Sequence, residues 1–289
     1  MGALYGMPNL DVLWDYAKRY FGKVADLTLA EMPVGREALG EQIQLVLSVI
    51  AEMAKEFARD HDGAYGASLM LAVSREDIPR LSEVLRTPHR PEDDPVEDGH
   101  PNGKLRFAGY RTDVSAQSGL LILPADLALK ALPGPGLPQK DYPLVSLPIR
   151  FAPLDTVLPG APRAVLDGYS VHNDTRTLAD EDCMGLAPAT REEVRAYFGP
   201  GGDGEAIRSM ASVRIGRSGS DPVGVVNVDT NTENVLGADD AYHKTFIALV
   251  QPLLRLLEPL VRAFADAWWT EEGVVPNGKT LPPQAATQA

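Results

Sequence analysis

The stretch from residue 209 to residue 250 constrains the fold of this chain most strongly, because its hydrophobic pattern changes period along its length. Segments 211–215 and 222–228 are short and rich in β-branched residues, which predicts two strands. Segment 216–220 between them is polar and contains glycine, so it predicts the tight turn of a hairpin. Gly224 leaves room in the second strand for close approach of a neighbouring backbone. A polar loop and a long amphipathic helix follow.

The apolar residues of two segments, 39–57 and 246–264, have the spacing of amphipathic helices, in steps that alternate between four and three residues. These residues are Leu39, Ile43, Val46, Ile50, Met53 and Phe57 in the first segment and Phe246, Val250, Leu253, Leu257, Leu260 and Phe264 in the second. Such spacing is typical of a seam between two helices, and it equally suits a helix that covers the sheet of its own domain. Both interpretations stay open, and Pro252 and Pro259 should kink or restart the second helix.

Further segments of regular structure lie between these two helices. Segments 65–73, 105–112 and 119–123 predict strands, and 191–198 predicts a short helix. The prolines of segment 142–151 suit an edge strand or a loop better than a central strand.

A family pattern can be followed along the chain. The helix at 39–57 leads directly into the strand at 65–73, and Pro-Arg-Ala-Val-Leu-Asp at 162–167 fits the form P-x-x-I-x-D. The run Val-Gly-Val-Val-Asn-Val-Asp at 223–229 then precedes the last helix. This order resembles that of GAF domains, and the resemblance covers residues 37 to 266. It implies an α/β (α+β) fold with a GAF-like central antiparallel sheet and flanking N- and C-terminal amphipathic helices.

The resemblance implies the division of the chain into parts. Residues 1–35 form an N-terminal aromatic and basic helical extension, and residues 36–269 form the GAF-like domain. Two inserts rich in proline, at 87–104 and 133–140, are expected to be surface loops. The tail at 270–289 lacks periodicity and is expected to be disordered.

GAF domains are small sensory modules, so the resemblance implies a small-molecule-sensing regulatory domain that couples ligand binding to dimer or partner-helix packing. The expected dimer is a homodimer formed through the helices at 39–57 and 246–264. Ligands of this family lie beneath the connections between the middle strands, which here span residues 167 to 209. The ligand-binding candidates in that span are Asp167, Tyr169, His172, Asn173, Arg195, Tyr197, Arg208 and Ser209.

These candidates leave the ligand and the function open. Arg195 and Arg208 could hold the phosphate of a nucleotide-like molecule, and Tyr197 could stack on a base. A surface ion-pair ladder of Arg191 and Arg195 with Glu192 explains those two arginines nearly as well. A second hypothesis is a GAF-like dimerisation or docking scaffold that binds no ligand and lies near a membrane. Aromatic and basic residues at 10–23 could contact such a membrane, although packing of this segment on the domain is the stronger expectation.

Composition excludes several classes of function. The net charge of −13 argues against a general affinity for nucleic acid, because neutralising phosphates requires clustered Lys and Arg. No apolar run is long enough to span a membrane, and the single cysteine fits a reducing compartment. We therefore expect a soluble, cytoplasmic protein.

The sequence offers no recognisable catalytic motif. The glycine-rich segment 199–204 lacks the lysine of a phosphate-binding loop, and the histidines lack metal-ligand spacing. Cys183 stands alone among acidic residues, which should raise its pKa, and no Ser/His/Asp arrangement is evident from spacing. We therefore expect no enzyme, no metal ion and no cofactor.

Overall fold

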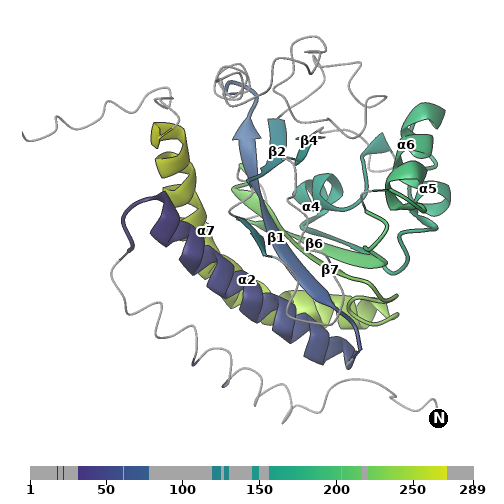
Figure 1. Cartoon of the computed structure of the whole chain (residues 1–289), viewed down its shortest axis with the longest axis horizontal. Helices are drawn as coiled ribbons and strands as arrows, with labels where there is room; N and C mark the ends of the chain where they lie inside the picture. Colours follow the sequence, from purple (N-terminus) through teal and green to yellow (C-terminus); the bar gives the residue numbers. More distant parts are fainter. Residues whose placement is uncertain are drawn as a thin grey trace, which may run out of the picture.

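The computed structural model of the chain describes residues 18, 22, 32–60, 62–77, 119–124, 127–129, 145–149, 156–202, 204–216 and 221–271. Its centre is an antiparallel sheet with the strand order β4-β2-β1-β7-β6-β5, and β3 pairs with β1 beside this path. Two long helices, α2 and α7, cover one face of the sheet, and the short helices α4, α5 and α6 lie on the other side (Figure 1). The predicted fold class, a central antiparallel sheet flanked by the two amphipathic helices, is confirmed.

The helices and strands have the following bounds. The helices are α2 (Arg36–Ala58), α4 (Ala161–Asp167), α5 (Leu178–Glu181), α6 (Pro188–Phe198) and α7 (Asp240–Glu271). The strands are β1 (Tyr65–Ser74), β2 (Gly119–Leu123), β3 (Ala128–Leu129), β4 (Val145–Ile149), β5 (Tyr169–His172), β6 (Ser209–Ile215) and β7 (Gly224–Thr230). Every element predicted within the described ranges is present, and β4, with its proline, is an edge strand as its sequence favoured.

Side chains along β1 alternate between the two faces of the sheet. Ala67, Leu69 and Leu71 belong to the large core beneath α2 and α7, whereas Met70 belongs to a second cluster on the opposite side. A strand side chain points to one face or the other with period two, so each central strand contributes to both layers. The sheet is therefore buried on both faces at its centre.

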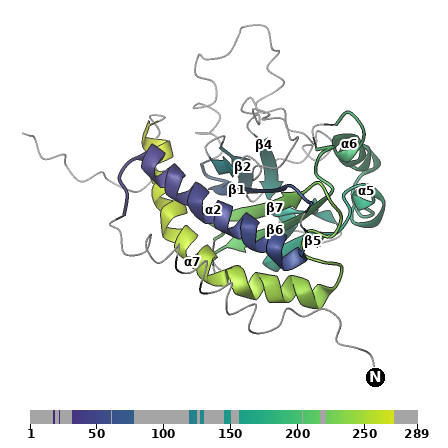
Figure 2. The same ribbon diagram turned by 60° about the horizontal axis from the view of Figure 1, so that its bottom comes forward.

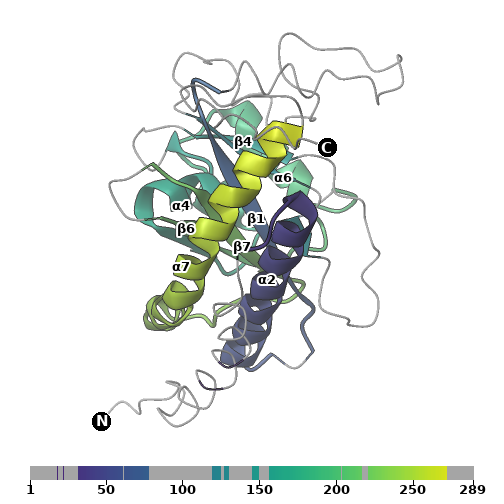
Figure 3. The same cartoon turned by 90° about the vertical axis from the view of Figure 1, so that its left-hand side faces the viewer.

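Helices α2 and α7 lie side by side over the sheet (Figure 3). The residues at the predicted seam positions of both helices are buried in one core of this chain, and the rings of Phe57 and Phe246 lie with their centroids 5.5 Å apart. Packing within the domain therefore accounts for both apolar stripes. A homodimer formed through these helices stays a prediction.

The two prolines of α7 do not interrupt it. Pro252 and Pro259 lie inside one helix and are exposed, so water can reach the carbonyl groups that lose their amide partners. The helix changes direction along its length (Figure 2), which agrees with a kink and not with a restart.

At Gly224 the backbone of β7 lies close to that of β1, as the glycine in this strand predicted. A Cβ atom at this position would lie 2.5 Å from the carbonyl oxygen of Met70 on β1. Only glycine allows β7 to begin at this distance from its neighbour.

Several predictions fall outside the described residues. They concern the strand at 105–112, the inserts at 87–104 and 133–140, almost all of the N-terminal segment, and the tail from residue 272. Among the described helices, none combines the length and the hydrophobicity needed to cross a membrane.

Candidate ligand-binding site

The strand register places a polar row across the sheet face opposite α2 and α7. Ser170 on β5 pairs with Ser212 on β6, Ser212 with Asn227 on β7, and Asn227 with Ser68 on β1. The Ser212 hydroxyl donates to Asn227 Oδ1 at 2.8 Å, and Asn227 Nδ2 donates to Ser68 Oγ at 3.4 Å. The amide of Asn227 thus joins three strands through side chains.

A second row lies beside the first and carries two ionisable groups. His172 on β5 pairs with Met210 on β6, Met210 with Asp229 on β7, and Asp229 with Gly66 on β1. A Cβ atom at Gly66 would lie 3.1 Å from the Asp229 carboxylate, so the glycine leaves space beside this side chain. Met210 separates the histidine from the aspartate.

A cavity of about 140 Å³ lies between these rows and helices α4, α5 and α6. Its wall is mostly apolar and includes Leu158, Ala161, Val194 and Phe198. Four of the polar residues in its lining, Ser68, Ser212, Asn227 and Asp229, come from the sheet, and Tyr197 comes from α6. An apolar cavity with a few convergent polar groups is the general form of a small-molecule site.

Asp229 is an ionisable group in the lining of this cavity. Burial raises the pKa of its carboxyl to about 6, and no charge or hydrogen bond opposes that shift. Among the described residues its side chain has no hydrogen-bond or ion-pair partner. Asp229 is half-buried, and a partly desolvated charge without a partner is costly, so this carboxylate favours a positively charged or hydrogen-bond-donating group in the cavity.

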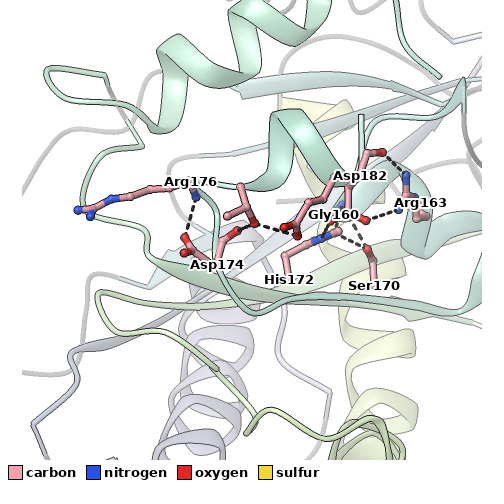
Figure 4. Close-up of polar contacts among 9 residues, drawn as sticks. Gly160, Arg163, Ser170, His172, Asp174, Arg176 and Asp182 are labelled. Carbon is pink, nitrogen blue, oxygen red and sulfur yellow. Dashed lines mark hydrogen bonds and ion pairs between the residues drawn. The ribbon is translucent and has the colours of Figure 1, made fainter. Parts of the chain in front are cut away.

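A chain of hydrogen bonds runs from the sheet to the loop after α5 (Figure 4). Ser170 Oγ lies 2.8 Å from His172 Nε2, and His172 Nδ1 lies 2.9 Å from Asp182 Oδ2. Arg163 donates to Asp182 Oδ1 at 3.2 Å and to the Asp182 carbonyl at 2.9 Å. The hydrogen bond from His172, followed by the charges of His172 and Arg163, holds the pKa of Asp182 below its usual range against the opposing effect of burial.

The backbone amide of Gly160 joins the same chain. It donates to His172 Nε2 at 3.1 Å and, less closely, to Ser170 Oγ at 3.3 Å. Since Nε2 accepts this N–H, the neutral ring carries its proton on Nδ1 and donates it to Asp182. Gly160 also lines the cavity, so the histidine lies directly behind part of the cavity wall.

The structure thus assembles a Ser/His/Asp chain that was not evident from sequence spacing. Ser170 and His172 are two residues apart on one strand, a signal that places both on the same face. Asp182 follows ten residues later, beyond α5, and only the fold brings it close. Ser170 is 6% exposed and is not part of the cavity lining, so this serine lacks the access that an attacking nucleophile needs.

Of the eight predicted ligand-binding residues, Tyr197 lines the cavity. His172 lies behind Gly160, and Asn173 uses its carbonyl to accept the Asn234 amide. Tyr169 and Ser209 lie toward the α7 side of the sheet, where the Ser209 hydroxyl donates to the Thr232 carbonyl.

The charged candidates lie away from the cavity. Arg195 is exposed and pairs with Asp180 and Glu192, as the surface ion-pair interpretation expected. Arg208 pairs with Asp174 and Glu233. Asp167 is exposed at the end of α4 and lines a separate polar groove beside α7. Binding of a ligand by these residues stays a prediction.

Sequence reasoning missed Ser68, Asn227 and Asp229 as cavity residues. Asn227 and Asp229 are polar residues within a mostly apolar run on β7. Their spacing of two was the signal that both side chains point to the same face of the sheet. Ser68 is the corresponding polar residue within apolar β1. Nothing local indicated that these strands would be neighbours.

Cys183 lies next to Asp182 in this region. The thiol is fully buried, and its pKa rises to about 11 chiefly through burial and only secondarily through the Asp182 charge. The acidic residues around Cys183 raise its pKa as expected, but burial is the larger cause. Within the described ranges, no group of three or more His, Cys, Asp or Glu residues is arranged to hold a metal ion.

No family model and no curated protein sequence matches this chain, but solved structures do. A GAF domain region from Geobacter sulfurreducens PCA is 14% identical, with a TM-score of 0.34, over 77% of this chain and 97% of its own. The free methionine-R-sulfoxide reductase from Neisseria meningitidis, in complex with its substrate, is 13% identical, with a TM-score of 0.34, over 92% and 99% of the two chains. The type II enzyme from Thermoplasma acidophilum is 12% identical, with a TM-score of 0.33, over 78% and 96%.

The fold of this chain is GAF-like, as the order of its helices and strands implied. The expectation that the protein is not an enzyme is contradicted, because solved structures similar to it include methionine-sulfoxide reductases. That expectation rested on the absence of motifs from the sequence. Catalytic groups are recognised by geometry and not by sequence position, so missing motifs could not support it.

Proposed function

We propose that this protein is a small-molecule-sensing regulatory domain whose ligand binds in the cavity between the sheet and helices α4 to α6. The observation that carries the proposal is Asp229, a carboxylate that lines a mostly apolar cavity and has no partner among the described residues. A ligand that supplies the missing partner would relieve the cost of burying this group.

The cavity restricts the class of ligand. A volume of about 140 Å³ is close to that of an engineered apolar cavity that holds benzene, so one ring or a short aliphatic chain fits. The end that meets Asp229 is a protonated amine or another hydrogen-bond donor. We infer that the ligand is a compact apolar amine.

The central strands supply the route from this cavity to the long helices. On β7, Asn227 and Asp229 face the cavity, whereas Val226 and Val228 lie in the core beneath α2 and α7. A ligand that repositions β7 therefore acts on both layers. Coupling requires that the ligand bind one arrangement of the helices better than the other.

Native mass spectrometry of the untreated protein, followed by denaturation, tests whether a molecule is retained. Titration with benzylamine and with its neutral analogue toluene, read as a shift of the melting temperature, then tests the charge preference. We expect benzylamine alone to stabilise the protein near neutral pH. Asp229→Asn should abolish the effect, and the exposed Asp62→Asn should retain it. An absence of retained molecules together with equal responses to both probes would contradict the proposal.

The docking scaffold without a ligand is the alternative that this cavity disfavours. A docking scaffold needs no cavity. If it binds no ligand, its interior is most stable when aliphatic side chains fill that space. The mass spectrum reports the number of copies in the assembly, so the same experiment also tests the homodimer.

A further inference from the structure

We propose that His172 is a proton-controlled latch that holds the Gly160 segment against the ligand cavity when the ring is neutral and loosens it when the ring is protonated. This inference rests on the proposed function for its biological meaning, because the segment concerned is a wall of the ligand cavity. Its mechanism rests only on the contacts of Gly160, Ser170, His172 and Asp182.

Gly160 ties part of the cavity wall to the sheet. It precedes α4, and its carbonyl accepts the Ala164 amide at 2.9 Å within the first turn of that helix. Its own amide donates to the histidine on β5. Leu158, Pro159, Gly160 and Ala161 all line the cavity, so the Gly160 amide lies within a continuous stretch of its wall.

The protonation state of His172 decides whether that anchor exists. Nδ1–H is directed at Asp182 Oδ2, so the lone pair on Nε2 is what receives the Gly160 amide. A protonated ring carries N–H groups at both nitrogens. Two donors would then face each other across 3.1 Å, and the bond from Gly160 to Nε2 is lost.

Ser170 and Gly160 respond differently to this change. A hydroxyl both donates and accepts, so Ser170 can rotate and accept the new Nε2–H. A backbone N–H can only donate. Gly160 is left with its longer contact to Ser170 Oγ, at 3.3 Å, which weakens the anchor without removing it.

The charged groups nearest the ring come from α4 and from the residue after α5. Asp182, directly after α5, presents its carboxylate to Nδ1, and Arg163 on α4 pairs with Asp182. Cys183 follows Asp182 in the chain with a neutral, buried thiol. On β6, Met210 is paired with His172 and is apolar, and Asp229 lies one strand further in the same row. Asp174, two residues along from His172, is paired with Arg208.

The test measures hydrogen exchange of the Gly160 amide, corrected for the intrinsic rate, at about pH 8 and about pH 5.5, a range in which histidines titrate. The protection of this amide in the native protein should fall about tenfold in acid, the ratio expected for losing one good hydrogen bond. His172→Gln offers an acceptor that cannot be protonated, so its protection should not depend on pH. His243→Gln is the matched control, because His243 is also buried and bonds instead to the Gly237 carbonyl.

Protection that is independent of pH in the native protein would overturn the latch, and so would an equal fall in His172→Gln. If the glutamine variant fails to fold, nitrogen NMR of the native histidine rings decides the question. The latch requires the proton on Nδ1 at about pH 8 and a ring titration that coincides with the loss of Gly160 protection. Neither readout uses a ligand. A working latch without amine binding would therefore contradict the proposed function alone.

Discussion

Asn227 and Asp229 point from the same face of β7 into one cavity, yet Asn227 is held by hydrogen bonds on both sides while Asp229 has none from the described residues. The Asn227 amide accepts from Ser212 and donates to Ser68, which leaves it little freedom to rearrange. Asp229 is half-buried, and none of the described residues supplies it with a counter-charge. We assign Asn227 to the support of the sheet and Asp229 to the recognition of a ligand.

Asp229→Asn should stabilise the free protein near neutral pH. The folded pKa of about 6 lies above that of an ordinary carboxyl, so the charged form is disfavoured by folding. This cost is absent in acid, grows as the pH rises above about 4 and is complete above about 6. The variant should gain about 3 kcal/mol at pH 7.5 and less than about 0.5 kcal/mol at pH 4, as measured by urea unfolding. An equal gain at both pH values would contradict the assignment.

Asp182→Asn should have the opposite dependence on pH. The pKa of Asp182 lies below its usual range, so its charge stabilises the fold above the ordinary carboxyl pKa, and this contribution is lost as the pH falls through the lowered value. The side chain is partly exposed, which limits the loss in the variant to about 1 kcal/mol near neutral pH. Thermal unfolding at about pH 7 and about pH 3 checks this, and the two proteins should converge in acid.

Gly224→Ala should destabilise the protein, because the new methyl group would lie 2.5 Å from the Met70 carbonyl oxygen and backbone would have to move. We expect a loss of about 1–3 kcal/mol. Gly40→Ala is the matched control on α2, where a Cβ atom would make an ordinary 3.5 Å contact with Phe264. Alanine is the better helix former, so this variant should be neutral or more stable. Equal losses in both variants, measured by urea unfolding, would exclude the backbone clash.

Cys183 should resist alkylation by iodoacetamide in the native protein. Its thiol is fully buried, and a pKa of about 11 leaves little thiolate near neutral pH. Mass spectrometry should detect alkylation only after unfolding in urea. Rapid modification of the native protein would show that this part of the structure opens readily.

Local pattern determined the elements of this protein. The apolar steps of four and three predicted α2 and α7, and the β-branched runs predicted β6 and β7, because hydrophobic period depends on neighbours within a few residues. The same pattern could not tell a seam between two chains from packing within one domain. The structure shows that both stripes are buried in one core, so packing within the domain accounts for them.

The tertiary structure decided the candidate site. Ser68 and Asn227 are 159 residues apart, and only the pairing of β1 with β7 brings them into one polar row. Asp182 reaches His172 only because α5 returns the chain over β5. Strand register and helix placement depend on the packing of the whole domain. They cannot be predicted from residues that are close together in the sequence. The sequence by itself thus determined which elements form, and the fold determined which side chains meet.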